Sequence, residues 1–219
     1  MASYVIVEGR GERLAVVNLL QRVSQRLGRG DVYWQIAYQT NALKNTAALK
    51  ELCERLRRHG DCERALLLQD DEDGCPREDG PNLTQQIEAL ALPFPTAFVL
   101  FYREYETLFL PCLHLMAGKT LVGDGDIELA VLAPGAAFYG DPEKPRDAKK
   151  EINRFLPPRR PYKPTTHQLA MTRLLDLDTL AAQGPPCYGT LERAMAFLLR
   201  ESHGVYPPPA PRPIGAARG

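Results

Sequence analysis

The sequence has little charge imbalance and few of the residues that mark specialised sites. Lys plus Arg and Asp plus Glu both number 27 among 219 residues, so the formal net charge is zero. An overall basic field that attracts nucleic acid is therefore absent, and any contact with DNA must use a local basic patch. The four histidines are scattered and do not have the spacing of a metal site.

The cysteines also lack a pattern. Five are present, an odd number, and no Cys-x-x-Cys pair occurs. Neither a disulfide framework nor a zinc ribbon fits such an arrangement. Reduced, structural thiols are the simplest account, and they predict a cytoplasmic protein.

Long uninterrupted apolar runs are missing as well. Residues 1–8 show no basic start followed by an apolar stretch, so we expect no signal peptide. The most apolar region, residues 89–116, is interrupted by Pro93, Pro95, Arg103, Glu104 and Glu106. Charges at that depth are costly in a bilayer, so the region predicts a core strand followed by a helix, with no membrane contact.

The first half of the chain alternates short apolar runs with helical patterns. Strands rich in β-branched and aromatic residues are predicted at 4–7, 31–39, 64–68 and 97–102, and helices at 12–27, 46–59 and 83–90. Strands that are apolar on both faces and alternate with helices are typical of a parallel sheet covered on both sides. The sequence therefore predicts an α/β fold with a mainly parallel sheet and helices on both faces.

The second half is less regular. Helices are predicted at 105–116, 146–155, 166–175 and 190–200, a strand at 127–132, and an extended loop at 156–164. We interpret residues 1–203 as a single domain, with a core at 1–116 and a helical and loop extension at 117–203. Residues 204–219 are rich in Pro, Gly and Ala and predict a disordered tail.

Acidic side chains follow three of the predicted strands. They are Glu8 after the first strand, Asp70, Asp71 and Asp73 after the third, and Glu104 and Glu106 after the fourth. Because the carboxyl ends of parallel strands share one crevice, these acids are expected to converge there. Converging carboxylates repel unless a cation neutralises them, and oxygen ligands of this kind suit Mg²⁺.

Simpler interpretations stay open for several of these features. An Asp-rich turn often serves only solubility and turn geometry, and Glu12 fits the start of a helix. Glu8 directly follows a buried strand and is expected to point into the crevice. Gly9 and Gly11 suggest a dinucleotide loop, but Leu14 replaces the third glycine and Glu8 would repel a pyrophosphate.

Basic residues gather later in the chain. They are Lys144, Arg146, Lys149, Lys150, Arg154, Arg159, Arg160 and Lys163. One interpretation is an ordinary solvated helix face. The other is a strip that binds phosphates beside the acidic centre.

Several short segments, taken in order, resemble a known family. Residues 5–12, Val-Ile-Val-Glu-Gly-Arg-Gly-Glu, resemble the start of toprim domains, and residues 66–76 resemble the Asp-x-Asp segment that follows it. Residues 102–106, Tyr-Arg-Glu-Tyr-Glu, resemble an Arg-Glu-hydrophobic-Glu motif at a strand end. The pattern is completed by Asp141-Pro142-Glu143, Lys149 or Lys150, Tyr162-Lys163 and Thr165. From about Tyr4 to Leu199 the chain thus resembles small bacterial toprim-domain proteins, the RloG-like group, which are similar to the toprim part of OLD-family nucleases.

This resemblance implies a toprim-like fold and a Mg²⁺ or Mn²⁺ site. The implied metal ligands are Glu8, Asp70, Asp71, Asp73, Glu104 and Glu106, and the implied catalytic groups are Glu8, Asp71, Asp73 and Lys150. Arg10, Lys149, Arg159, Arg160 and Lys163 are the implied contacts to nucleic acid. One departure matters, because Gln69 stands where the family has its first Asp and Gly74 resembles an insertion. The Asp-x-Asp pair is then either Asp71 with Asp73, or it has lost its first member.

The leading hypothesis is a Mg²⁺-dependent nuclease or nuclease subunit that acts on DNA. The resemblance also implies an ATPase partner in a system linked to restriction or phage defence. A non-catalytic scaffold that binds an ATPase or effector is the alternative, and a small-molecule phosphohydrolase is a third. The oligomeric state stays open, a homo-oligomer included.

Overall fold

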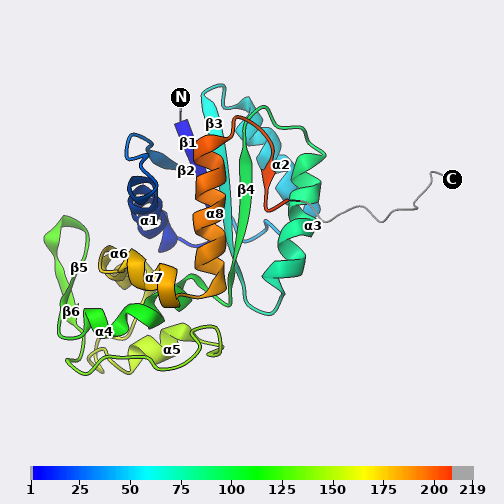
Figure 1. The fold of residues 1–219 in the computed structure, drawn as a ribbon. Helices are drawn as coiled ribbons and strands as arrows, with labels where there is room; N and C mark the ends of the chain where they lie inside the picture. Colours follow the sequence, from blue (N-terminus) through cyan, green and yellow to red (C-terminus); the bar gives the residue numbers. More distant parts are fainter. Residues whose placement is uncertain (1, 209–219) are drawn as a thin grey trace.

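The computed structural model describes residues 2–208. Its centre is a five-stranded sheet in the order β2-β1-β3-β4-β7, in which every neighbouring pair is parallel (Figure 1). The strands are β1 (Ala2–Val7), β2 (Trp34–Gln39), β3 (Cys62–Asp71), β4 (Thr96–Tyr102) and β7 (Val205–Tyr206). The predicted α/β fold with a mainly parallel sheet is confirmed.

Helices cover both faces of this sheet, as the apolar strands require. Helices α1 (Glu12–Arg26) and α8 (Pro186–Arg200) lie on one face, and α2 (Thr46–Arg58) and α3 (Pro76–Glu88) on the other (Figure 1). Successive strand residues alternate between the two cores, so Leu66 and Leu68 of β3 pack with α1 and α8, while Leu67 packs with α2 and α3. This alternation decides where the acids at the strand ends point.

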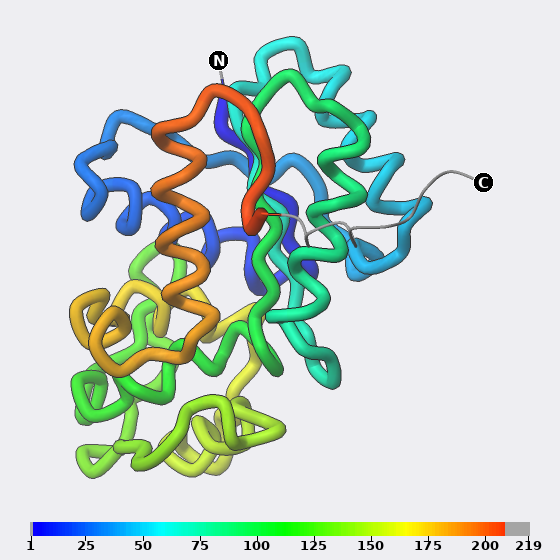
Figure 2. The backbone as a smooth tube through the Cα atoms, turned by 45° about the vertical axis from the view of Figure 1, so that its right-hand side comes forward, coloured from blue at the N-terminus to red at the C-terminus, as the bar shows by residue number. Residues whose placement is uncertain are grey.

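A second group of elements lies at the carboxyl ends of the strands (Figures 1 and 2). It comprises the 3-10 helices η1 (Tyr105–Cys112) and η2 (Asp124–Asp126), the helices α4 (Leu113–Met116), α5 (Ala148–Asn153), α6 (Pro164–Arg173) and α7 (Leu177–Gln183), and the two-stranded antiparallel sheet of β5 (Thr120–Val122) and β6 (Glu128–Val131). Its apolar side chains join the α1 and α8 core without a break. The extension therefore closes over the edge at which the acids emerge.

Several boundaries differ from the predictions. β3 continues through Asp71 instead of ending at Leu68, and α3 begins at Pro76 instead of Leu83. The predicted helix at 105–116 is mostly a 3-10 helix, which contains Pro111, because proline cannot supply an interior helical N–H. Helix α7 was not predicted.

The C-terminal part of the chain belongs to the core. α8 packs against β4, so the core extends beyond residues 1–116. The predicted disordered tail from residue 204 is wrong at its start, because Val205 and Tyr206 pair with β4. Residues 209–219 of that tail lie outside the described part of the chain. Between residues 2 and 208, no helix is long and apolar enough to cross a membrane.

Candidate acidic site

Acids from two neighbouring strands meet at the carboxyl edge of the sheet. The backbone N–H of Asp70, near the end of β3, donates to Oε2 of Glu8, which follows β1, at 3.1 Å. Asp70 Oδ1 in turn accepts from the backbone N–H of Tyr105 at 2.9 Å. These two bonds connect the ends of β1 and β3 to the segment that follows β4.

A single ammonium group holds the acids that follow β4. Lys149 Nζ is bonded to Glu104 and lies 3.6 Å from Glu106 Oε2. The backbone N–H of Lys149 also donates to Glu104 Oε1 at 3.1 Å. Lys149 is placed there by α5, whose first turn is capped by the Asp147 side chain. Lys149 therefore enters the cluster, whereas Lys150 is exposed, and the catalytic role predicted for Lys150 stays a prediction.

Glu12 belongs to the same cluster, although the sequence marks this residue only as a helix start. Its Oε2 accepts from the backbone N–H of Glu8 at 3.0 Å, and its side chain is buried. A glutamate at the start of a helix is usually explained by the helix dipole alone. Its place in the Glu8-Gly9-x-Gly11-Glu12 segment was the one sequence signal that Glu12 is part of the site. We call Glu8, Glu12, Asp70, Glu104 and Glu106 with Lys149 the acidic cluster.

Burial and mutual repulsion shift the protonation of this cluster. Burial raises the pKa of Asp70 well above its usual range, and the carboxylates of Glu12 and Glu106 raise it further. Burial likewise raises the pKa of Glu8 and of Glu12. For Lys149, the neighbouring carboxylates outweigh burial and raise the ammonium pKa, so this side chain stays charged. Glu8, Glu12, Asp70 and Glu106 thus lie around one permanent positive charge, and their burial and crowding favour the protonated forms of these carboxyls.

Glu106 is the most buried acid of the cluster. Burial raises its pKa to about 7. Its Oε1 accepts from Tyr162 Oη at 2.9 Å and from Gln168 Nε2 at 3.4 Å. These donors come from the loop before α6 and from α6 itself, so the extension fixes the orientation of this carboxyl. A group with this pKa can hold or release a proton near neutral pH.

Asp71 does not join the cluster. The sequence predicts Asp71 beside Glu8, but β3 runs through this residue, and the alternation of side chains along the strand turns Asp71 to the α2 and α3 face. There it is fully buried, bonded to Lys44 Nζ, and it accepts from the backbone N–H of Gly74 at 3.1 Å. The expected convergence of Asp71 with Glu8 is therefore corrected, and Asp70 takes its place.

Asp73 lies at the rim of an open cleft beside the cluster. Its side chain is 78% exposed, and it pairs with Arg146 at 2.7 Å and with Arg103 at 3.7 Å. The cleft has a volume of about 450 Å³, and Glu104 and Lys149 form part of its wall. Glu72, two residues after Asp70, also lines the cleft. Burial is the main cause of the raised pKa of Glu8, and the charge of Glu72 raises this pKa further. Asp70 and Glu72 thus form an acid-x-acid pair in the frame one residue earlier than predicted.

The basic residues proposed for nucleic acid do not all reach the cleft. Lys149 points into the acidic cluster, while Arg10, Arg159 and Lys163 are exposed. Arg160 is exposed too, although its guanidinium bonds to the backbone oxygen of Leu129. Arg146, which lines the cleft, was part of the predicted basic strip.

The donor set suits a hard divalent cation, but its side chains are not drawn together as a finished site. Carboxylate oxygens are the ligands that Mg²⁺ prefers, and the cluster carries an excess of negative charge. Within residues 2–208, no three His, Cys, Asp or Glu side chains are grouped closely enough to hold a metal ion. Lys149 provides the positive charge in this arrangement.

The fold and the site define a class of α/β protein with an acidic cluster at the carboxyl ends of a parallel sheet. The chain belongs to a family described as "Domain of unknown function (DUF4276)", whose model matches residues 7–196. The matched region includes every residue of the acidic cluster. No curated protein and no solved structure matches the chain significantly.

Proposed function

We propose that this protein is a Mg²⁺- or Mn²⁺-dependent toprim-type nuclease, or the nuclease subunit of a larger assembly, that acts on DNA. The observation that carries the proposal is the hydrogen bond between the Asp70 backbone and the Glu8 carboxylate, with Glu12, Glu104 and Glu106 around it. Acids from three strand ends meet at the edge where open parallel sheets bind ligands.

The residues of the cluster divide into two roles in this proposal. Glu8 and Asp70 would hold the metal ion. When bound, such an ion would activate water and neutralise charge on a phosphodiester. Lys149 orients Glu104 and adds positive charge beside the cleft. Glu106 holds a proton at its carboxyl near neutral pH and is oriented by Tyr162.

The proposed partners follow from the resemblance to toprim proteins and from charge. The net charge is zero, so the isolated chain has no long-range attraction for DNA. An ATPase subunit that supplies a DNA channel would compensate for this, in a cytoplasmic system of phage defence or restriction. We therefore propose weak DNA binding and slow cleavage by the chain alone.

A non-catalytic scaffold is the second candidate, and the position of Lys149 favours it. An ammonium group inside an acidic cluster can replace the metal as a permanent counterion. In that case the fold would present a surface to an ATPase or effector without cleaving DNA.

Nicking of supercoiled plasmid in the presence of Mn²⁺ separates these two candidates. The assay compares the chain alone and with its co-expressed ATPase, for the unchanged protein, Asp70→Asn and the matched variant Asp71→Asn. The nuclease proposal predicts that Asp70→Asn loses the activity and that Asp71→Asn keeps it wherever the variant is folded. Equal nicking by Asp70→Asn and the unchanged protein in the complex would favour the scaffold.

A further inference from the structure

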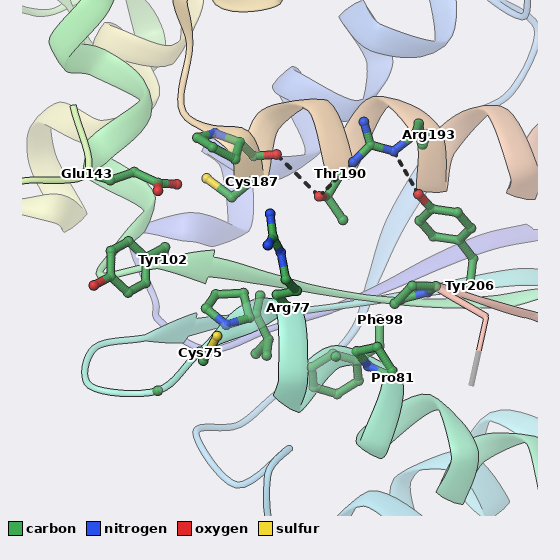
Figure 3. A pocket seen from close by; sticks show the side chains of 16 residues that line it. Cys75, Arg77, Pro81, Phe98, Tyr102, Glu143, Cys187, Thr190, Arg193 and Tyr206 are labelled. Carbon is green, nitrogen blue, oxygen red and sulfur yellow. Dashed lines mark hydrogen bonds between the residues drawn. The ribbon is translucent and has the colours of Figure 1, made fainter. Parts of the chain in front are cut away.

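A second cavity lies on the other side of the loop that follows β3. It has a volume of about 580 Å³ and lies between the N-terminal turns of α3 and α8, along the outer edge of β4 (Figure 3). Pockets that bind small molecules have volumes of about 300–1,000 Å³. None of the residues of the acidic cluster lines this cavity.

The cavity exists because the edge of the sheet is only partly covered. β7 pairs with β4 at Thr96 and Ala97 and no further. Pro207 follows directly, and since proline has no N–H it cannot extend the ladder. Beyond Ala97, the outer edge of β4 therefore has no strand partner within the described residues, and Phe98, Leu100 and Tyr102 lie along this edge.

Two arginines give the cavity a positive mouth. Arg193 of α8 is held in position, because its Nε donates to Tyr206 Oη at 3.0 Å and its Nη2 to Thr190 Oγ1 at 3.1 Å. Arg77 of α3 points across the cavity toward Cys187 and Thr190 (Figure 3). Within residues 2–208, no acidic side chain forms an ion pair with either Arg77 or Arg193.

The opposite end of the cavity carries a different group. Glu143 lies there near Tyr102, away from Arg193 (Figure 3). It is partly buried, and burial raises its pKa. A carboxyl in this position can form hydrogen bonds with the polar edge of a ligand.

From these contacts we infer that the cavity binds a small molecule in which an anionic group adjoins a planar apolar part, as in a mononucleotide. The anionic group pairs with Arg77 and Arg193, since guanidinium groups match phosphate and carboxylate oxygens. The planar part lies against the partly exposed ring of Tyr102, at the Glu143 end of the cavity, because aromatic rings stack on flat groups. This site differs from the acidic cluster in position and in the sign of its charge.

Isothermal titration calorimetry in EDTA tests this inference, with the four 5′-mononucleotides as probes. EDTA removes divalent cations, so the result does not depend on a metal at the acidic cluster. We expect at least one mononucleotide to bind, and its nucleoside and inorganic phosphate each to bind at least about tenfold more weakly. Arg77→Ala should weaken mononucleotide binding about tenfold or more, and Arg193→Ala should do the same.

Arg58→Ala is the matched control, because Arg58 is an exposed arginine at the end of α2 and does not line the cavity. It should leave binding unchanged. The inference is overturned by an absence of binding for all four mononucleotides at millimolar concentration. It is also overturned if the nucleoside or inorganic phosphate binds as tightly as the mononucleotide. The same holds if Arg77→Ala and Arg193→Ala leave mononucleotide binding unchanged.

Discussion

Lys149 is the residue on which the electrostatics of the acidic cluster depend. It contacts Glu104 and Glu106, and it lowers the pKa of Asp70 against the effect of burial. Its neighbour Lys150 is exposed and has no such contacts. The two lysines are therefore a natural pair of test and control.

Lys149→Met should destabilise the protein by about 1–3 kcal/mol in EDTA, because breaking a partly buried ion pair leaves carboxylates without a counterion. Millimolar Mg²⁺ should restore more stability to this variant than to the unchanged protein. Urea unfolding with and without Mg²⁺ measures both effects. Lys150→Met should change stability by no more than about 0.5 kcal/mol, and an equal loss in the two variants would contradict the role of Lys149.

Glu106 gives the stability of the protein a particular dependence on pH. Its folded-state pKa of about 7 lies above the ordinary value of 4.5. Between these values the folded protein keeps a proton that the unfolded chain releases, so stability decreases as pH rises. The titration of Glu106 alone lowers the free energy of unfolding by at most about 3 kcal/mol as pH rises through this range.

Glu106→Gln removes this titration while keeping an oxygen that can accept from Tyr162. We expect the variant to lose less stability than the unchanged protein between pH 5 and pH 8. Urea unfolding in EDTA at the two pH values gives the difference. Parallel pH profiles would mean that Glu106 does not titrate in this range.

The candidate site could be predicted in part because strand ends are visible in the sequence. Glu8, Asp70, Glu104 and Glu106 were all expected at one edge, and the structure brings them together. The prediction for Asp71 was wrong because it ended β3 three residues early. Side chains alternate between the two faces of the sheet as far as Asp71, and this residue therefore faces α2 and α3 instead of Glu8. Whether Lys149 or Lys150 enters the acidic cluster depends on the rotation of α5 about its axis, and long-range packing sets this rotation.

At the scale of elements, the close approach of α1 and α6 holds the acidic cluster together. Gly11 precedes α1, and a Cβ there would lie 2.6 Å from Gln168 Oε1 and 2.7 Å from the Pro164 backbone. Gln168 also donates to Glu106. The absence of a side chain at Gly11 thus allows the extension to reach the cluster.

Gly11→Ala should destabilise the protein by about 1–3 kcal/mol, because backbone atoms of α6 must move to accept the methyl group. Gly60→Ala is the control, since a Cβ at Gly60 meets no atom within 4 Å. Thermal unfolding of the two variants provides the comparison. A Gly11→Ala variant as stable as Gly60→Ala would show that the contact is loose.

Elements with a regular apolar pattern were the predictable ones. β1, β4, α1 and α2 were predicted to within a few residues, because their burial follows the period of a strand or a helix. β7 was missed because two residues cannot show a period, and its position depends on pairing with β4. α3 was shortened because Gly80 and Pro81 fall inside it.

For the molecule as a whole, the proposed binding to DNA depends on the distribution of charge. Four of the proposed contacts, Arg10, Arg159, Arg160 and Lys163, are exposed, while Lys149 is engaged by acids. Neutralising four phosphates predicts a slope of about −4 for log affinity against log salt. Fluorescence anisotropy of labelled duplex DNA over a range of salt concentrations tests this, and a slope near zero would contradict binding through these residues.

We propose that Glu8 and Asp70, and not Asp71, hold the metal ion. Calorimetric titration of Mn²⁺ into the unchanged protein, Glu8→Gln, Asp70→Asn and Asp71→Asn tests it most directly, with circular dichroism to establish that each variant is folded. We expect Mn²⁺ to bind to the unchanged protein and to Asp71→Asn, and we expect Glu8→Gln and Asp70→Asn to lose this binding. Binding that persists in Asp70→Asn, or that disappears only in Asp71→Asn, would contradict it.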